Sequence, residues 1–273
     1  MRDRVYGDAT RSSEGRRSIV VALLTISVFL LVFSVSCRQI TAPEPARNVI
    51  EAGLVTLTDL DQMIADDGPE LRQAALESQA QAITIPGYPL DIVLTRDEVL
   101  KSSDQQLRGL ILERSSALLY ADGVDAFDRT GDRKIRRLSL QGLLELEVGQ
   151  LSDSNYSRAT FLSVIAILGC AVFGAMTAAN GQGWGRMRSL GFAAAAGAVP
   201  VILLFLLLKL VVGAVGGSDP FEDALRDVTD ATVTVPIRNG IIVLIGGAVI
   251  VAAALVLGRL DRDSSEAKFG EDY

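Results

Sequence analysis

The chain contains no histidine among its 273 residues, and this absence excludes several kinds of catalytic and metal site. Histidine is the commonest general base and the commonest zinc ligand, and it completes Ser–His and Cys–His nucleophile pairs. The His-containing motifs of zinc metalloproteases are excluded for the same reason. No other catalytic or cofactor motif stands out, so we expect a non-catalytic protein without a cofactor or metal. An enzyme with this sequence would have to use Ser, Asp, Glu, Lys or Tyr alone as its catalytic residues.

Cysteine is also scarce, since the chain has only Cys37 and Cys170. The segment 38–159 contains neither, so no internal disulfide can stabilise it. The stretch Ser34–Cys37 resembles the end of a bacterial lipoprotein signal, in which Cys37 would be lipidated after cleavage, but Ser34 stands where that pattern has an aliphatic residue. An uncleaved signal anchor fits better, because the apolar run before Cys37 is long for a cleavable signal.

Long apolar runs are the main feature that is present. They are Ile19–Val35, Phe161–Ala179, Leu190–Val215 and Ile241–Leu257. About 20 apolar residues suffice to cross the hydrocarbon layer of a bilayer, which is roughly 30 Å thick. The sequence therefore predicts an all-α integral membrane protein with four transmembrane helices and a mainly helical exoplasmic domain, 38–159, between the first and the second. The predicted transmembrane helices are 19–37, 160–179, 190–215 and 240–258.

Charge predicts which side of the membrane each segment faces. Basic residues gather in the N-tail 1–18, the loop 180–189 and the C-tail 259–273, whereas the loop 216–239 is acidic. Cytoplasmic loops carry the excess of Lys and Arg, so we expect both termini in the cytoplasm and the domain outside. The signal anchor and the Arg- and Ala-rich composition favour a bacterial inner (plasma) membrane. The net charge of −7 gives no reason to expect a nucleic-acid partner.

Apolar spacing predicts the first helices of the exoplasmic domain. Residues one helical turn apart form one apolar face: Ile50, Leu54, Leu57, Leu60 and Ile64. We expect Asp66–Pro69 to end this helix and Pro69 to begin another that runs to about Gln81. The stretch Ile83–Leu94, which contains two prolines and a glycine, is expected to be a loop with at most a short strand.

Capping residues predict two later helices. Thr95–Glu98 and Ser103–Gln106 both fit the capping box, in which two side chains satisfy two free backbone N–H groups. Gly123 is expected to end the second of these helices with a positive φ. Ser152–Ser157 is expected to be a polar hinge before the second transmembrane helix.

Small residues recur at helical spacing in two of the predicted transmembrane helices. They are Ala166, Cys170, Gly174 and Ala178 in the second, and Ala248 and Ala252 in the fourth. Small side chains spaced by four let helix backbones approach closely. We therefore expect Gly174 to face another helix of the same chain, with dimerisation through this face as the alternative.

Charged residues provide few other candidate sites. The one outward basic run, Arg129, Arg133, Lys134, Arg136 and Arg137, is a candidate contact for a partner or for anionic lipid, with a charged helix face as the alternative. Lys209 is the single charge inside the apolar runs, and its side chain can snorkel to the interface rather than line a pore. The acidic residues between Asp59 and Glu70 lack the spacing of a calcium loop, so a solvated helix end is expected.

These features leave two classes of function. The first is a non-catalytic membrane protein: an envelope scaffold, a sensor or an accessory subunit, with a protein partner or a second copy recognised by the exoplasmic domain. The second follows from the layout of one span, a large outward domain and three further spans, which is similar to the topology of the FtsX-like permease family. That resemblance implies a transport-associated permease subunit. The loop 180–189 departs from it, because it is too short for the cytoplasmic coupling helix of those permeases.

The predicted orientation has a direct test. A cysteine introduced at Asp67 should react with a membrane-impermeant maleimide in intact cells, because the basic loops place residue 67 outside. Labelling that appears only after the membrane is permeabilised would contradict this orientation.

Overall fold

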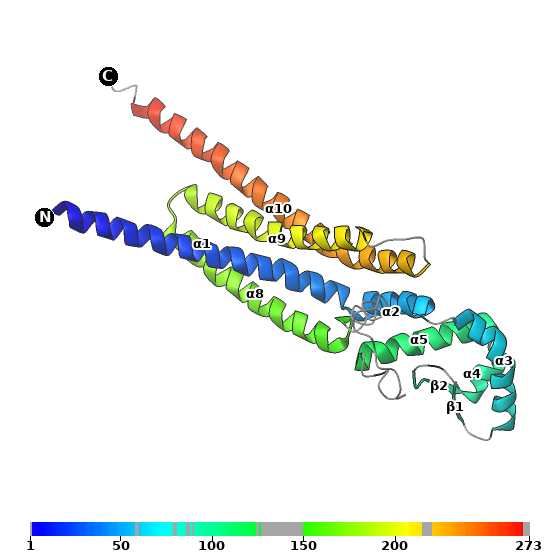
Figure 1. Ribbon diagram of the computed structural model, residues 1–273. Helices are drawn as coiled ribbons and strands as arrows, with labels where there is room; N and C mark the ends of the chain where they lie inside the picture. The colour runs from blue at the N-terminus through cyan, green and yellow to red at the C-terminus, as the bar shows by residue number, and fades with distance from the viewer. Residues whose placement is uncertain are drawn as a thin grey trace. The chain divides into compact units, whose positions relative to one another are not determined.

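The computed structural model describes residues 2–57, 60–78, 81–85, 88, 90–123, 126, 150–214 and 220–269, and these are nearly all helical. The elements in chain order (Figure 1) are α1 (Arg2–Ile40), α2 (Pro43–Leu57), α3 (Leu60–Glu77), β1 (Ala82–Thr84), β2 (Val93–Thr95), α4 (Arg96–Lys101), α5 (Asp104–Asp122), α8 (Asp153–Asn180), α9 (Gly185–Ala214) and α10 (Pro220–Phe269). The chain divides into two compact units. The membrane unit comprises Met1–Cys37, Ala159–Lys209 and Val233–Tyr273, and the helical domain comprises Arg38–Arg158 and Leu210–Thr232.

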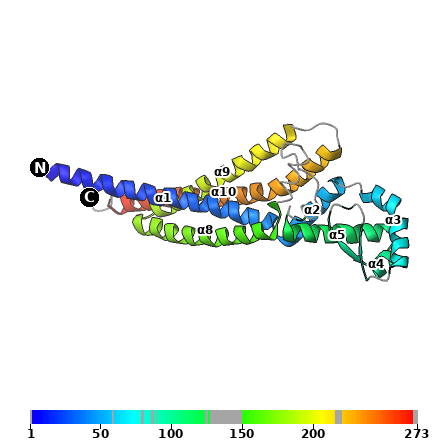
Figure 2. The ribbon, with the colours of Figure 1, turned by 60° about the horizontal axis from the view of Figure 1, so that its bottom comes forward.

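Four helices are long and apolar enough to cross a bilayer, which confirms the prediction of a multi-pass membrane protein. The candidate spans are Gly15–Ile40, Asp153–Asn180, Gly185–Ala214 and Thr232–Asp261. They leave large apolar side chains exposed, as expected for helices surrounded by lipid; Phe161 of α8, for example, is 66 % exposed. Figure 2 shows α8 running alongside α1, as Figure 1 does.

Helical structure extends beyond the predicted boundaries. α1 already begins at Arg2, and α10 is continuous for 50 residues from Pro220. The acidic segment 216–239, predicted as a loop, is therefore helical from Pro220 onward. Proline is favoured at the first position of a helix, where its missing N–H would have no partner anyway. The predicted hinge Ser152–Ser157 is also mostly helical, because α8 begins at Asp153.

In the membrane unit, α1 lies against α8 and α9 at glycine residues. A Cβ atom at Gly197 of α9 would lie 2.7 Å from the carbonyl oxygen of Thr25, and one at Gly169 of α8 would lie 2.9 Å from Ser27 Oγ. At Gly197 the obstacle is backbone, which cannot move aside as a flexible side chain can. Glycine therefore sets how closely α9 approaches α1.

α10 makes a polar contact with α1 and a glycine contact with α9. Asn239 Nδ2 donates a hydrogen bond to Ser36 Oγ at 3.0 Å, and the Ser36 hydroxyl donates to the Val32 carbonyl oxygen at 2.7 Å. A Cβ atom at Gly247 would lie 2.7 Å from the carbonyl oxygen of Gly191, and a Cβ atom at Gly191 would lie 2.7 Å from the carbonyl oxygen of Gly247. α1 thus contacts each of the other three spans.

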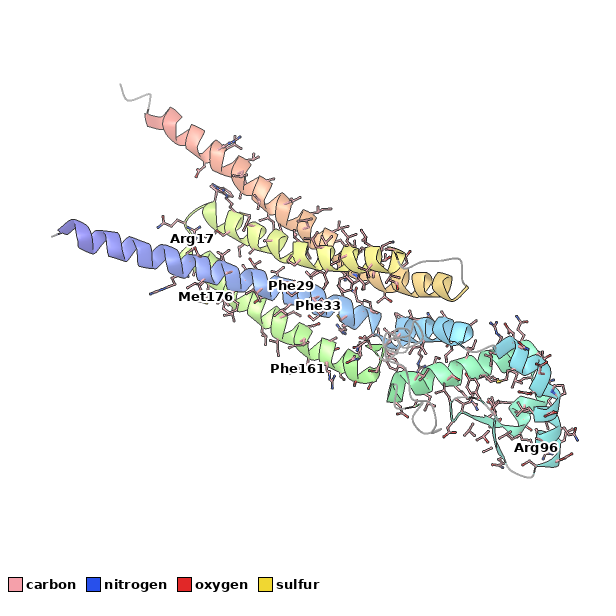
Figure 3. All side chains as sticks on the ribbon, viewed as in Figure 1. Arg17, Phe29, Phe33, Arg96, Phe161 and Met176 are labelled. Atoms are coloured by element: carbon pink, nitrogen blue, oxygen red, sulfur yellow. The ribbon has the colours of Figure 1, made fainter. Side chains whose placement is uncertain are left out.

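Larger apolar side chains fill the space between these helices. Val32 of α1, Val201 and Phe205 of α9 and Val233 of α10 form a buried cluster. The ring centroid of Phe33 lies 6.2 Å from that of Phe205, and Phe29 and Phe33 themselves (Figure 3) stack at 6.1 Å. Glycine contacts and bulky contacts therefore occur along the same helices.

The helical domain surrounds a core supplied by α2, α3, α5 and a short antiparallel sheet. β1 pairs with β2 so that Ile83 lies opposite Leu94, and both side chains are buried while their strand neighbours are exposed. The stretch predicted as a loop with at most one short strand thus contains a strand at each end. The prediction of at most one short strand is wrong here, because alternate burial of Ile83 and Leu94 favours two paired strands.

α3 continues through the residues that were predicted to break it. Gly68 and Pro69 both lie inside this helix, whose buried residues are Leu60, Ile64, Gly68, Leu71 and Ala75. A residue before proline avoids the helical conformation partly because its Cβ atom meets the proline ring, and Gly68 has no Cβ atom. Ala65, whose carbonyl group loses its partner at Pro69, is exposed to solvent. α3 can therefore continue through Pro69 with only a small loss of stability.

Both predicted capping boxes are confirmed. Thr95 Oγ1 accepts from the Glu98 N–H at 3.3 Å, and the Glu98 carboxylate accepts from the Thr95 N–H at 2.8 Å. Ser103 and Gln106 make the same reciprocal pair at the start of α5. Gly123 ends α5 with a φ of 64°, as predicted.

The glycine contacts predict an asymmetric response to bulk. Gly191→Leu should lower the Tm of the full chain in lipid nanodiscs, because overpacking at a backbone contact costs about 1–3 kcal/mol. Gly174→Leu should change it little, because nothing lies within 4 Å of the position that a Cβ atom would take there. Equal losses of Tm for the two variants would contradict the packing described above.

Candidate functional site

A pocket opens in the helical domain between α3, β1 and α5, with a volume of about 460 Å³. This volume lies in the range of small-molecule sites, which is about 300–1,000 Å³. Its floor is formed by Leu107 and Ile111, which lie one turn apart on α5 and are 0 % and 1 % exposed. β1 and the residue after it supply one wall through Ile83, Thr84 and Ile85.

The opposite wall is α3, which presents two parallel rows of side chains to the pocket. The deeper row consists of Ile64, Gly68 and Leu71, part of the buried stripe that continues through Pro69. Gly68 widens the pocket, because a Cβ atom there would meet only Ile64 Cγ2, at 3.8 Å. If α3 had ended at Asp66 as predicted, this wall would not exist.

The outer row of α3 forms the rim of the pocket. It comprises Met63, Asp67, Glu70 and Ala74, which follow one another at steps of four, three and four and so share one helix face. Asp67, Glu70 and Ala74 are exposed, and Met63 is half-buried. An apolar space is therefore bordered on one side by two carboxylates.

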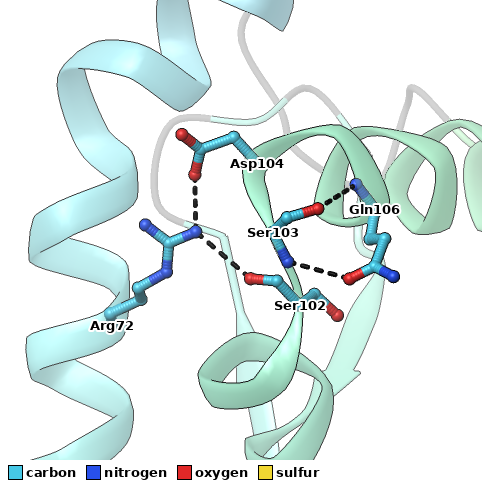
Figure 4. A network of polar contacts seen from close by, with 5 residues as sticks. All are labelled: Arg72, Ser102, Ser103, Asp104 and Gln106. Carbon is cyan, nitrogen blue, oxygen red and sulfur yellow. Dashed lines mark hydrogen bonds and ion pairs between the residues drawn. The ribbon is translucent and has the colours of Figure 1, made fainter.

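Arginine side chains connect the elements around the pocket. Arg72 of α3 donates to the Ser102 carbonyl oxygen at 3.4 Å and pairs with Asp104 at 2.5 Å, which ties α3 to the start of α5 (Figure 4). The Arg96 side chain, labelled in Figure 3, donates to the carbonyl oxygens of Ala75 and Leu76 at 2.8 and 3.2 Å. It thereby satisfies two carbonyl groups in the last turn of α3.

A third arginine links β2, α4 and α5. Arg114 donates to the Val93 carbonyl oxygen and forms an ion pair with Glu98 at 2.5 Å. The hydrogen bond from the Thr95 backbone N–H, together with the Thr95 side chain and Arg114, lowers the pKa of Glu98 below its ordinary value. These contacts fix β2 and α4 against α5, so the domain around the pocket is braced by charged groups as well as by its core.

Two tyrosines hold buried polar positions elsewhere in the domain. The Tyr88 hydroxyl lies 2.9 Å from Ser115 Oγ of α5, and burial raises the pKa of Tyr88. The Tyr120 hydroxyl donates to the Thr41 carbonyl oxygen at 3.0 Å. Both contacts satisfy groups that burial would otherwise leave without a partner.

The residues predicted to pack the spans occupy varied positions. Ala166 is buried, Cys170, Gly174 and Ala178 are half-buried, and Ala248 and Ala252 are exposed. Gly169 lies close to the Ser27 side chain of α1 and Gly247 lies close to the backbone of α9, and each is one residue before a predicted position. One residue corresponds to a rotation of about 100° around a helix, which is enough to move a position off the contact face.

Other predicted sites are not assembled by the structure. The basic run Arg129, Arg133, Lys134, Arg136 and Arg137 lies outside the described residues, as does Asp59. Cys37 and Cys170 are half-buried and are not joined in a disulfide. Within the described part of the chain, no group of three or more Cys, Asp or Glu residues is arranged to hold a metal ion.

The pocket was not predicted from the sequence, although the spacing of residues along α3 contains a signal for it. The row Met63, Asp67, Glu70 and Ala74 borders the buried stripe of the same helix and mixes apolar and acidic residues. Such a row indicates a helix edge between core and solvent. The row was not recognised, because the helix was predicted to end in the middle of the row.

Comparisons of the chain with protein-family models, with curated proteins and with solved structures found no match.

The contacts of Glu98 predict a pH dependence. Its pKa is lowered by folding, so its stabilising contribution is present above its ordinary pKa of 4.5 and disappears as the pH falls through the lower folded value. Glu98→Gln should therefore have a lower Tm than wild type at pH 7, and the difference should shrink on acidification. Circular dichroism of the full chain in nanodiscs would measure this. A difference that is constant from neutral to acidic pH would contradict the assigned role of the carboxylate.

Proposed function

We propose that this chain is a non-catalytic membrane protein of the bacterial inner membrane, acting as an envelope scaffold, a sensor or an accessory subunit, whose helical domain recognises a ligand or partner outside the cell membrane. The observation that carries the proposal is the pocket of the helical domain. It combines a defined volume, an apolar floor and a polar rim, which are the features of a recognition site.

The packing of α1 supports the interpretation of this helix as a retained signal anchor. Cleavage before Cys37 would remove α1, which packs against Gly169 of α8 and Gly197 of α9 and receives a hydrogen bond from Asn239 of α10. The glycine faces of α8 and α9 would then lose the helix that fits them. The packing therefore favours an uncleaved helix over a lipidated Cys37. With the basic loops on the cytoplasmic side, both chain termini would lie in the cytoplasm.

The link between α8 and α9 weighs against the permease alternative. Only Gly181–Trp184 separates the two helices. The coupling helix implied by the resemblance to FtsX-like permeases would need a longer cytoplasmic segment. This short link supports recognition, rather than coupling to an ATPase, as the role of the chain.

Two matched substitutions on α3 test the proposal. Ala74 and Ala65 are both exposed alanines of this helix, but only Ala74 lines the pocket. The Ala74→Phe side chain should cover the pocket and abolish co-purification of the native ligand or partner from its own membrane, whereas Ala65→Phe should retain it. Mass spectrometry of proteins, lipids and small molecules bound to the full chain would read this out. If bound material were the same for wild type and both variants, the pocket would not be the recognition site.

A further inference from the structure

The apolar lining of the pocket favours a ligand with an apolar part. Leu107 and Ile111 are almost completely buried within the domain, yet their side chains also line this partly open space. Each CH₂ group of a ligand that leaves water for this apolar lining raises the affinity about fourfold. Ile64, Leu71 and Ile83 extend the same apolar surface along both walls.

The rim of the pocket adds a requirement for charge. Asp67 and Glu70 are three residues apart on α3, so they lie on the same face of the helix. Among the residues that the structure describes, neither carboxylate has a hydrogen bond or an ion pair. The neighbouring Asp66 is also acidic and exposed, but it does not line the pocket.

Two arginines that could neutralise the rim are engaged elsewhere. Arg108 follows Leu107 of the pocket floor, but it pairs with Asp61 at 2.8 Å. Arg72 follows Leu71 of the wall, but it pairs with Asp104 and binds the Ser102 carbonyl oxygen. These two arginines therefore compensate Asp61 and Asp104, and neither of them pairs with Asp67 or Glu70.

We propose that this pocket binds an amphiphilic organic cation, with its hydrocarbon part over Leu107 and Ile111 and its cationic group beside Asp67 and Glu70. The inference rests on the proposed recognition function and specifies its ligand class. Anions are disfavoured by both carboxylates, and a neutral ligand gains nothing from them. The attraction at an exposed rim amounts to about 0.2–1 kcal/mol per carboxylate, so with two carboxylates the cation and its neutral analogue should differ by about two- to thirtyfold in affinity.

Three probes with one hydrocarbon part separate shape from charge. They are 4-phenylbutylamine, 4-phenylbutanol and 5-phenylvalerate, which carry the same phenylbutyl group and are cationic, neutral and anionic at pH 7. Isothermal titration calorimetry on the full chain in nanodiscs, with empty nanodiscs as the blank, should give the order amine, alcohol, acid from tightest to weakest. Raising the salt concentration should reduce this preference, because the rim carboxylates are exposed.

Matched variants locate the binding. Asp67→Asn with Glu70→Gln should weaken binding of the amine about two- to thirtyfold and leave binding of the alcohol unchanged, whereas Asp66→Asn should change neither. Ala74→Phe should abolish binding of the amine and the alcohol, and Ala65→Phe should not.

Several results would overturn the inference. Equal affinity for the three probes, or no binding of any, would reject an amphiphilic cation, while co-purification that depends on Ala74 would still support recognition by the pocket. A change of oligomeric state caused only by Ala74→Phe, measured by light scattering, would identify a second copy of the chain as the occupant. Binding that survives Ala74→Phe would place the cation elsewhere.

Discussion

Close approach of helix backbones is the constraint on which the membrane unit depends. Lipid is as apolar as the helices, so burial of leucine and valine against a neighbouring helix gains little there, and packing and polar contacts must hold the helices together. The structure supplies these at Gly169, Gly191, Gly197 and Gly247 and at the Asn239–Ser36 hydrogen bond. α1 takes part in three of these contacts, which makes the first span the helix that connects the others.

The helical domain is stabilised by different physics. Its helices bury apolar stripes away from water, and each buried apolar side chain adds to the free energy of unfolding. Three arginines then fix short elements whose apolar area is small: Arg72 ties α3 to α5, Arg96 caps α3 from the start of α4, and Arg114 joins β2 and α4 to α5. Of these contacts, the one made by Arg72 joins α3 and α5, two of the elements that line the pocket.

α3 links the architecture of the domain to its proposed role. Its buried stripe packs partly into the core and partly against the pocket, and the adjacent row ends the apolar surface with two carboxylates. One helix therefore supplies both the fold and the chemistry of the site. The pocket wall therefore depends on the continuity of α3 through Gly68 and Pro69.

The four spans, both capping boxes and the positive φ of Gly123 can be predicted from the sequence alone, because each depends on one continuous stretch of chain. Packing between separate elements accounts for the rest. α3 continues through Gly68–Pro69 because its buried stripe finds partners on α5, and β1 and β2 form because Ile83 and Leu94 meet on one buried face. Which small residues touch another helix depends on helix rotation, and the close approaches at Gly169 and Gly247 lie one residue before the predicted Cys170 and Ala248. The pocket likewise exists only where three separate elements meet, which spacing along the chain does not show.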